Sequence, residues 1–415
     1  MRTRGQDSIS TERVTLSVRM RFNPLRGLTP ERLAQYLDQF DLGFFRLAAI
    51  TWDRIERRDY KLRAVAPKRK KAVARRGWEI VTVEEAPGVH EPALARRQAE
   101  ALRYFYNHLT ATDALRPDQQ GGVALLVRQM MDAVGKTYAV HEIVWQPKAG
   151  GLTAQFVHCP LWWFEGITGK LRYLDNEFQV YGRDMNAAEW MVTCGEGLME
   201  ASSVAWMFKH LALQDWLTLC EKFGTPFLDA STTAEPGSPE WDALVDYVKN
   251  FGPDGGGVRS KEAAITPVEL RNSAGALHEK MVENMDRALT VLWRGGDLST
   301  TSAKEHAGAS LQEEESEILE SDDAALIEET LAAQVSRFVI AWMFGADAPV
   351  LACLKFRPRE KEAVELDLAI DTFLLNAGAP LGMRGALERY GRALPEAGEE
   401  LLKAKAALPN VPVTE

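Results

Sequence analysis

The sequence predicts an α+β fold in which several long helices accompany one antiparallel sheet. Residues 203–223 and 311–345 carry apolar side chains over many turns at the spacing of a helix. Residues 138–145 and 152–157 alternate as strands do, and the Lys-Ala-Gly-Gly segment between them is typical of a hairpin turn. Long helices and a hairpin on one chain favour a mixed architecture.

Length, charge and cysteine usage limit the classes of protein. The chain has 415 residues, enough for two or three domains, and a formal net charge of −10. Proteins that bind nucleic acid are usually basic, so this composition disfavours a conventional nucleic-acid binder. The 4 cysteines form no CxxC pair, which indicates buried thiols in a reducing cytoplasm. We see no signal peptide and no membrane span, and we expect a soluble chain with no membrane partner.

The first half of the chain is predicted to alternate between helices and strands. Residues 1–28 are polar and irregular, and we interpret them as an arm. Thr29-Pro30-Glu31 supplies an N-cap, a proline and an acidic first turn, so a helix should begin there. Further helices are expected at 47–59, 92–109 and 122–134, and a strand at 78–83. Residues 162–164 and 171–174 should continue the central sheet.

The second half is dominated by helices. The helix 203–223 is apolar nearly all round, so neighbours from its own or other subunits must enclose it. Residues 225–272 predict a small α/β insertion, after which Ser273 caps the next helix. After Gly345 we expect a strand at 354–356 and helices at 360–377 and 384–390.

Charge is segregated along the chain. Residues 61–76 hold eight Lys or Arg and no acid, whereas 311–345 hold nine Asp or Glu against the single Arg337. Either run alone is typical of a solvated face. Together they are typical of a chain whose faces meet different neighbours.

No catalytic constellation is found. The sequence lacks GxSxG, HExxH, P-loop and GxGxxG motifs. His141 and Glu142 are adjacent in a predicted strand and point to opposite faces, so they cannot ligate one ion together. We therefore expect no metal, no cofactor and no enzymatic activity.

Several short motifs follow one another in a characteristic order over residues 40–400. They are Trp52-Asp53-Arg54, Gly77-Trp78-Glu79-Ile80, His141-Glu142-Ile143-Val144-Trp145, Trp162-Trp163-Phe164, Glu221-Lys222-Phe223-Gly224-Thr225-Pro226-Phe227, Gly296-Asp297-Leu298-Ser299-Thr300-Thr301, 373–378 and 387–394. In this order the motifs resemble the Mu-like branch of the portal proteins of tailed bacteriophages. The resemblance implies the portal fold and a ring, usually of twelve subunits, at one capsid vertex.

The resemblance also implies a division of the chain into functional segments. The segments are an arm (1–28), a wing (29–200), a first stem helix (201–224), a clip (225–272), a second stem helix (273–295), a tunnel loop (296–310), a tunnel-side helix (311–346), and a wing return with a short crown (347–415). Such subunits pass double-stranded DNA through the ring without reading its sequence. Their other partners are the terminase large subunit, head-completion and connector proteins, and capsid and scaffold proteins. The protein would be assembled in the host cytoplasm and reside in the virion.

Three sets of residues are the candidate sites under this resemblance. The tunnel loop would project into the DNA channel, an acidic wall would repel phosphates, and clip aromatics would dock the terminase or the connector. The tunnel-loop set is Asp297, Leu298, Ser299, Thr300, Thr301, Ser302 and Lys304; the wall set is Glu313, Glu314, Glu315, Glu317 and Glu320; the clip set is Trp241, Tyr247 and Phe251. The basic run 61–76 is expected to face subunit or capsid neighbours, or packaged DNA on the outer wall.

Two other classes remain open on the sequence alone. One is a monomeric α/β enzyme or nucleic-acid-processing accessory of unrecognised type. The other is a DNA-binding regulator that uses residues 61–76, which the overall acidity disfavours.

Overall fold

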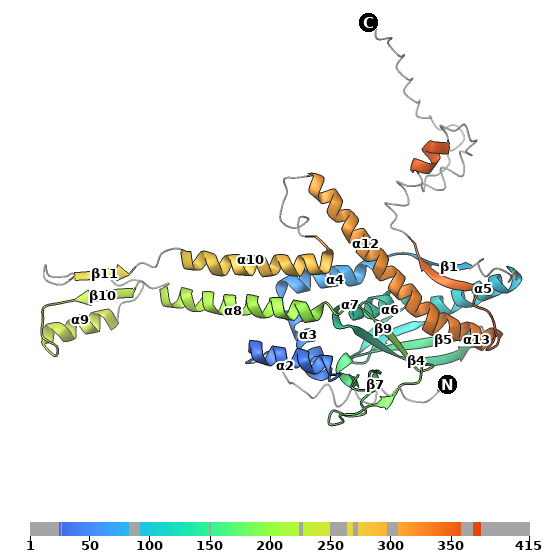
Figure 1. Ribbon diagram of the computed structural model, residues 1–415, viewed down its shortest axis with the longest axis horizontal. Coiled ribbons are helices and arrows are strands. Elements are labelled where there is room, and N and C mark those ends of the chain that lie inside the picture. The colour runs from blue at the N-terminus through green and yellow to red at the C-terminus, as the bar shows by residue number, and fades with distance from the viewer. Residues whose placement is uncertain are drawn as a thin grey trace, which may run out of the picture. The chain divides into compact units, whose positions relative to one another are not determined.

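The structure is a computed structural model with two units, residues 1–356 and 357–415 (Figure 1). It describes residues 25, 27–82, 92–148, 151–223, 227–249, 264–268, 273–296, 306–357 and 368–374. In the second unit, residues 368–374 are helical, within the predicted helix 360–377. All other elements belong to the first unit. Among the described residues, no helix is long and apolar enough to cross a membrane.

A five-stranded sheet forms the centre of the first unit. Its strand order is β3-β2-β5-β4-β9, and its middle is the predicted hairpin of β4 and β5, in which Lys148 pairs with Gly151. The pair β2–β5 is parallel, and the remaining neighbours are antiparallel. The strands are β2 (Thr110–Asp113), β3 (Arg116–Gly121), β4 (Tyr138–Lys148), β5 (Gly151–Cys159) and β9 (Trp190–Cys194).

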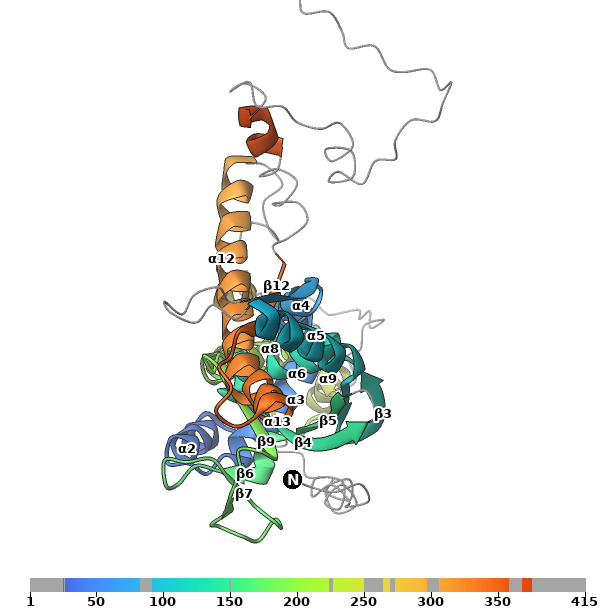
Figure 2. The ribbon, with the colours of Figure 1, turned by 90° about the vertical axis from the view of Figure 1, so that its right-hand side faces the viewer.

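Helices cover both faces of this sheet, which explains why residues 139–143 of β4 are all buried. One hydrophobic core lies between the sheet, α5 (Pro92–His108), α6 (Val123–Met130) and the helical segment 306–344. Phe105 and Phe156 are among its buried side chains. The other core joins the sheet to α3 (Arg46–Arg58) and to two long helices, around Trp52 and Trp293. Figure 2 shows α5 and α6 above β4 and β5, with β6 and β7 below them.

Three helices at the start of the unit include one that the sequence analysis did not predict. The helix α2 (Pro30–Asp41) begins as expected, because Thr29 Oγ1 accepts a hydrogen bond from the Arg32 amide at 3.4 Å. The basic run forms α4 (Tyr60–Ala74), capped by Asp59, whose side chain accepts from two backbone amides. Pro67 lies inside α4, where it removes one backbone hydrogen bond.

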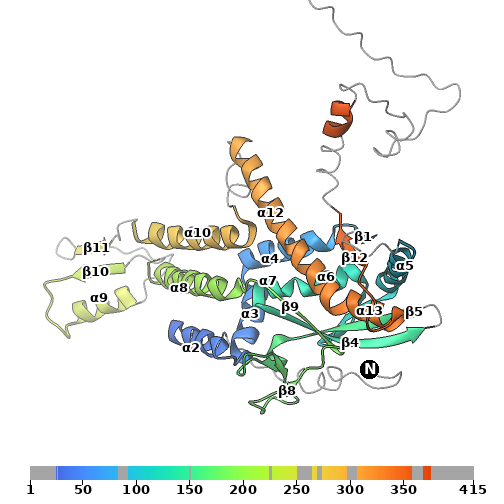
Figure 3. The ribbon, with the colours of Figure 1, turned by 45° about the vertical axis from the view of Figure 1, so that its right-hand side comes forward.

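Two long helices lie side by side and run antiparallel (Figures 1 and 3). They are α8 (Met199–Phe223) and α10 (Ser273–Arg294), at the positions predicted for them. The chain between them contains the antiparallel pair β10 (Phe227–Ser231) and β11 (Ala264–Val268), with α9 (Pro239–Lys249). The Ser238 hydroxyl caps α9 by accepting from the Trp241 amide at 3.2 Å.

The predicted helix 311–345 differs from the structure in two respects. The helix α12 (His306–Leu331) begins five residues earlier, and a π-helical turn (Ala332–Ser336) separates it from α13 (Arg337–Phe344). The chain then forms β12 (Ala352–Phe356), which pairs antiparallel with β1 (Trp78–Thr82).

The prediction that residues 162–164 and 171–174 continue the central sheet is wrong. Pro160 and a 3₁₀ turn (Leu161–Trp163) end the strand, because proline cannot donate to a strand ladder. The following residues form a separate small sheet of β6 (Phe164–Glu165), β7 (Arg172–Tyr173) and β8 (Arg183–Asp184). The helix α7 (Asp132–Lys136) also follows α6 where a single helix was predicted.

Candidate functional site

The helix α8 carries large apolar side chains that the described part of the chain leaves exposed. On its inner side Trp206 and Met207 are buried in the core shared with α10. Elsewhere on α8 large apolar side chains are exposed, and Leu217 is 62% exposed. Val204 and Phe208 lie on one side of the helix, and Leu213 and Leu217 lie on the opposite side, because nine residues correspond to about half a turn of rotation. Exposed apolar side chains of this kind are typical of subunit interfaces.

A buried lysine joins α8 to α10 and to the start of α4. Lys209, 1% exposed, forms ion pairs with Asp59 and with Asp286, the latter at 2.8 Å. The Tyr60 hydroxyl donates to the Asp286 carboxylate at 2.7 Å, and burial together with that hydrogen bond raises the pKa of Tyr60. The cluster therefore fixes the two long helices to the helical layer that carries the basic run.

The other end of α4 is fixed to α12. Arg69 donates to both oxygens of Asp323 at 2.8 and 2.9 Å, and both side chains are buried. Burial raises the pKa of Asp323, although Arg69 opposes this effect. Arg69 also bonds Glu196 at 2.9 Å, and Arg76 lies 3.8 Å from Glu320.

The expectation that the whole basic run faces neighbours, capsid or DNA is therefore wrong for part of it. Arg69 and Lys70 are buried and paired with acids of the same chain, because the fold supplies partners distant in sequence. In the same helix Arg63, Lys68, Lys71 and Arg75 remain exposed.

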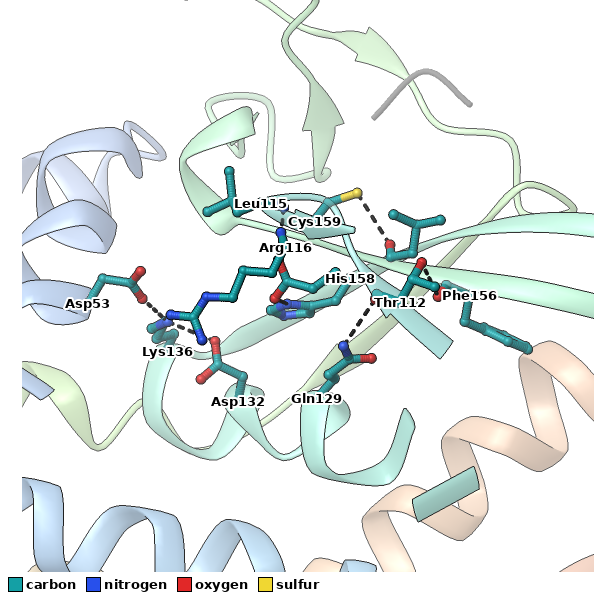
Figure 4. A network of polar contacts seen from close by, with 12 residues as sticks. Asp53, Thr112, Leu115, Arg116, Gln129, Asp132, Lys136, Phe156, His158 and Cys159 are labelled. Atoms are coloured by element: carbon teal, nitrogen blue, oxygen red, sulfur yellow. Dashed lines mark hydrogen bonds and ion pairs between the residues drawn. The ribbon is translucent and has the colours of Figure 1, made fainter. Parts of the chain in front are cut away.

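Lys70 and its partners line a charged cavity of about 500 Å³. Figure 4 shows Asp53, Asp132 and Lys136 of this group, together with Arg116 and His158 of the lining. Lys70 bonds Glu56 and Asp132 at 2.7 Å each, and Lys136 bonds Asp132 at 2.8 Å and also pairs with Asp53. Burial alone would raise the pKa of Asp132, but Lys136 and Lys70 hold it well below its usual range. The cavity is walled by α3, α4, α6, α7, the β2–β3 turn and the end of β5.

Two histidines lie directly opposite each other on β4 and β5, with ring centroids 5.1 Å apart. His158 faces the cavity and lies 3.6 Å from Asp113. His141 is fully buried, and neither ring nitrogen has a hydrogen-bond partner among the described residues. Burial lowers the pKa of His141 well below its usual range, so this ring is neutral at pH 7.

The structure does not bring the three predicted sets of site residues together. The tunnel-loop residues 297–302 and 304, and Phe251 of the clip, lie outside the described residues. Trp241 is 36% exposed on α9, and Tyr247 is half-buried on the same helix. No contact between these groups is described.

The predicted acidic wall lies on the first turns of α12. Glu315 is exposed and Glu317 is half-buried, whereas the side chains of Glu313 and Glu314 lie outside the described set. Glu320 is only 13% exposed and pairs with Arg76, so its charge is offset within the subunit.

Sequence reasoning missed the charged cavity. Its one local signal is the pair Asp132 and Lys136, which lie one helical turn apart in an otherwise apolar stretch. A charged pair buried at that spacing indicates a polar site within the core.

Comparison with known proteins places the chain among bacteriophage portal proteins. The model of the family described as the portal protein of Mu bacteriophage matches residues 50–392. Because the match spans most of the sequence, the chain belongs to this family. A comparison with curated proteins gave no match.

Solved structures with a similar arrangement come from phage and from gene transfer agent particles. An HK97-family phage portal protein from Corynebacterium diphtheriae is 14% identical, with a TM-score of 0.41 over 75% of this chain and 96% of its own. A chain from the neck of an empty gene transfer agent particle is 14% identical, with a TM-score of 0.49 over 84% and 98%. A chain from the virion of a native gene transfer agent is 13% identical, with a TM-score of 0.49 over 93% and 99%. The family assignment rests on the family model.

Proposed function

We propose that this portal-family protein assembles as a closed ring, of twelve subunits as in its family, at one capsid vertex. The single observation that carries the proposal is the exposure of large apolar side chains on α8, with Phe208 on one side of the helix and Leu217 on the opposite side. Exposed apolar area of this extent is stabilised when neighbouring copies cover it.

In this ring α8 and α10 form the stem, and the segment between them with α9 forms the clip. The clip docks the terminase large subunit during packaging and the head-completion or connector proteins afterwards, with Trp241 as an accessible aromatic anchor. Capsid and scaffold proteins contact the outer part of the ring. The protein is assembled in the host cytoplasm and remains in the virion.

The channel of the ring carries double-stranded DNA without reading its sequence. The loop before α12 and the first turns of α12 contribute its lining, so that Glu315 faces the phosphates. Carboxylates repel the DNA backbone and prevent the tight, counterion-releasing attachment that lysines would give. The protein acts as a conduit and docking platform and performs no chemistry of its own.

The ring is tested by native mass and by imaging of the purified protein. A 46.3 kDa monomer and a ring of roughly half a megadalton are easily separated. Leu217→Asp together with Phe208→Asp should abolish the ring, because apolar side chains covered by neighbouring copies would be replaced by buried charge. Phe178→Asp is the matched control, since Phe178 is 93% exposed on the β7–β8 loop. A wild-type protein that stays monomeric at every concentration, also with capsid components present, would exclude the ring.

A further inference from the structure

The charged cavity holds more positive than negative charge at its accessible side. Its floor acids are already engaged by Lys70 and Lys136. Five further cations line the cavity. Arg57 pairs with Asp53, whereas the other four form no ion pair with a described residue. These four are Arg63, Lys71, Arg116 and Arg128. The cavity is therefore a site for an anionic group that no described residue of the subunit supplies.

The cavity and α12 lie on opposite faces of α4. Residues 63, 67 and 71 are spaced by one helical turn and all line the cavity. Arg69 projects from the opposite face of α4 and bonds Asp323 of α12. The order across the subunit is therefore cavity, then α4, then α12.

The outer face of α12 carries acids without ion pairs. Asp323 and Ile327 are buried against the subunit, whereas Asp322 and Glu329 are exposed on the opposite face. These two carboxylates are seven residues apart, so they lie on one line about 10 Å apart. Neither forms an ion pair with a described residue.

We propose that the cationic cavity of one copy receives Asp322 and Glu329 from α12 of the next copy in the ring. The inference rests on the ring proposed above, and it names the residues that each copy contributes. Two complementary patches on opposite sides of one subunit form a head-to-tail contact, and such contacts close into rings. The cavity is incomplete until the neighbouring copy supplies the carboxylates.

A second copy fits this site better than duplex DNA does. The net charge of −10 makes copies repel one another, so a contact that pairs cations with acids directs association into one orientation. The cations also surround a hollow of about 500 Å³ whose floor contains Asp132 and Glu56. A hollow of this size admits protruding side chains but is too small to admit a duplex.

Charge reversal tests this contact through ring assembly. Arg63→Glu with Lys71→Glu should weaken subunit association by about fivefold or more for each reversed charge, and Asp322→Lys with Glu329→Lys should do the same. All four substitutions together should restore much of the loss, because the charges are again complementary. The measurement is the ring fraction against protein concentration by native mass spectrometry and sedimentation.

Lys68→Glu with Arg75→Glu is the matched control, since both residues are exposed on α4 outside the cavity. These variants should assemble as the wild type does. If the wild type forms rings and the cavity variants form them equally well, the contact is wrong while the ring stands. If the Arg63→Glu and Lys71→Glu variants assemble normally but retain less duplex DNA, the cavity binds phosphate and the proposal is overturned. A wild type that never forms a ring refutes the proposed function itself.

Discussion

Several buried charged side chains of this protein form ion pairs with residues that are far away in the sequence. Lys209 is the clearest case, because it lies on a helix that reads as apolar yet is almost fully buried between two carboxylates. A buried ion pair contributes little net stability when it is intact, but it is costly to break on one side only. The cluster around Lys209 therefore specifies how α4, α8 and α10 meet.

Replacing Lys209 with Met should lower the free energy of unfolding by about 3–5 kcal/mol, because Asp59 and Asp286 would be left as uncompensated buried charges. The measurement is chemical denaturation at neutral pH. Lys280→Met on the exposed side of α10 is the control and should change the stability little. Equal effects of the two substitutions would contradict the structural role given to Lys209.

His141 should make stability decrease as the pH falls below about 6.5. Its pKa in the folded protein lies well below the unfolded value of about 6.5, so the unfolded chain binds a proton that the folded chain does not. Stability is therefore unaffected above that pH and decreases as the pH falls below it, by at most about 1.4 kcal/mol per pH unit.

The check is denaturation of the wild type and of His141→Leu at several pH values. The variant should lose most of this slope, whereas His108→Gln at an exposed position should keep it. A wild-type free energy of unfolding that does not change below pH 6.5 would show that protonation of His141 does not destabilise the folded protein.

At the scale of elements, α12 combines two functions along one helix. Its buried face fixes it to α4 through Asp323, and its exposed face carries Glu315, Asp322 and Glu329. Glu315→Lys with Glu317→Lys should leave the fold near native, since substitutions at accessible positions usually cost within about 0.5 kcal/mol. It should slow DNA passage, and more strongly at low salt, because attraction to phosphate grows as screening falls.

The measurement is the packaging rate at several ionic strengths. Glu320→Lys makes a useful contrast, because it also removes the partner of Arg76 and should lower stability as well. If the packaging rate is unchanged by these charge reversals at every salt concentration, the acidic residues only form a solvent-exposed helix face and have no role in the channel.

The loop before α12 gives a separate prediction at the same scale. Deleting Thr300 to Ala303 should leave ring formation intact, while packaged DNA or its retention should decrease. The physical reason is that small polar residues contribute little buried area and so little to assembly. Ring yield is measured by native mass, and DNA retention by nuclease protection of assembled particles. Unchanged packaging and infectivity would rule out a role in the channel.

At the scale of the molecule, the sequence predicts those structural features that depend on residues adjacent along the chain. The β4–β5 hairpin, the Thr29 cap and the two long helices α8 and α10 follow from local spacing and are confirmed. The helix α4 was not predicted because its many Lys and Arg residues obscure the apolar spacing by which an amphipathic helix is recognised. Its buried cations make sense only with partners such as Asp323, 254 residues away from Arg69. Long-range pairing of this kind leaves no local pattern, and the charged cavity was missed for the same reason.

The π-helical turn Ala332–Ser336 has a consequence for how this chain tolerates insertions and deletions. Such a turn is equivalent to one extra residue within an α-helix, and each residue rotates the following helix by about 100°. Removing one residue here would turn Val339 and Ile340 of α13 out of the core while α12 stayed in place. The hydrogen bond between Ser336 and Tyr106 at 2.9 Å would be lost as well. The turn thus sets the rotational phase between two helices, and a single-residue deletion there should be tolerated far less well than a point substitution at an exposed position.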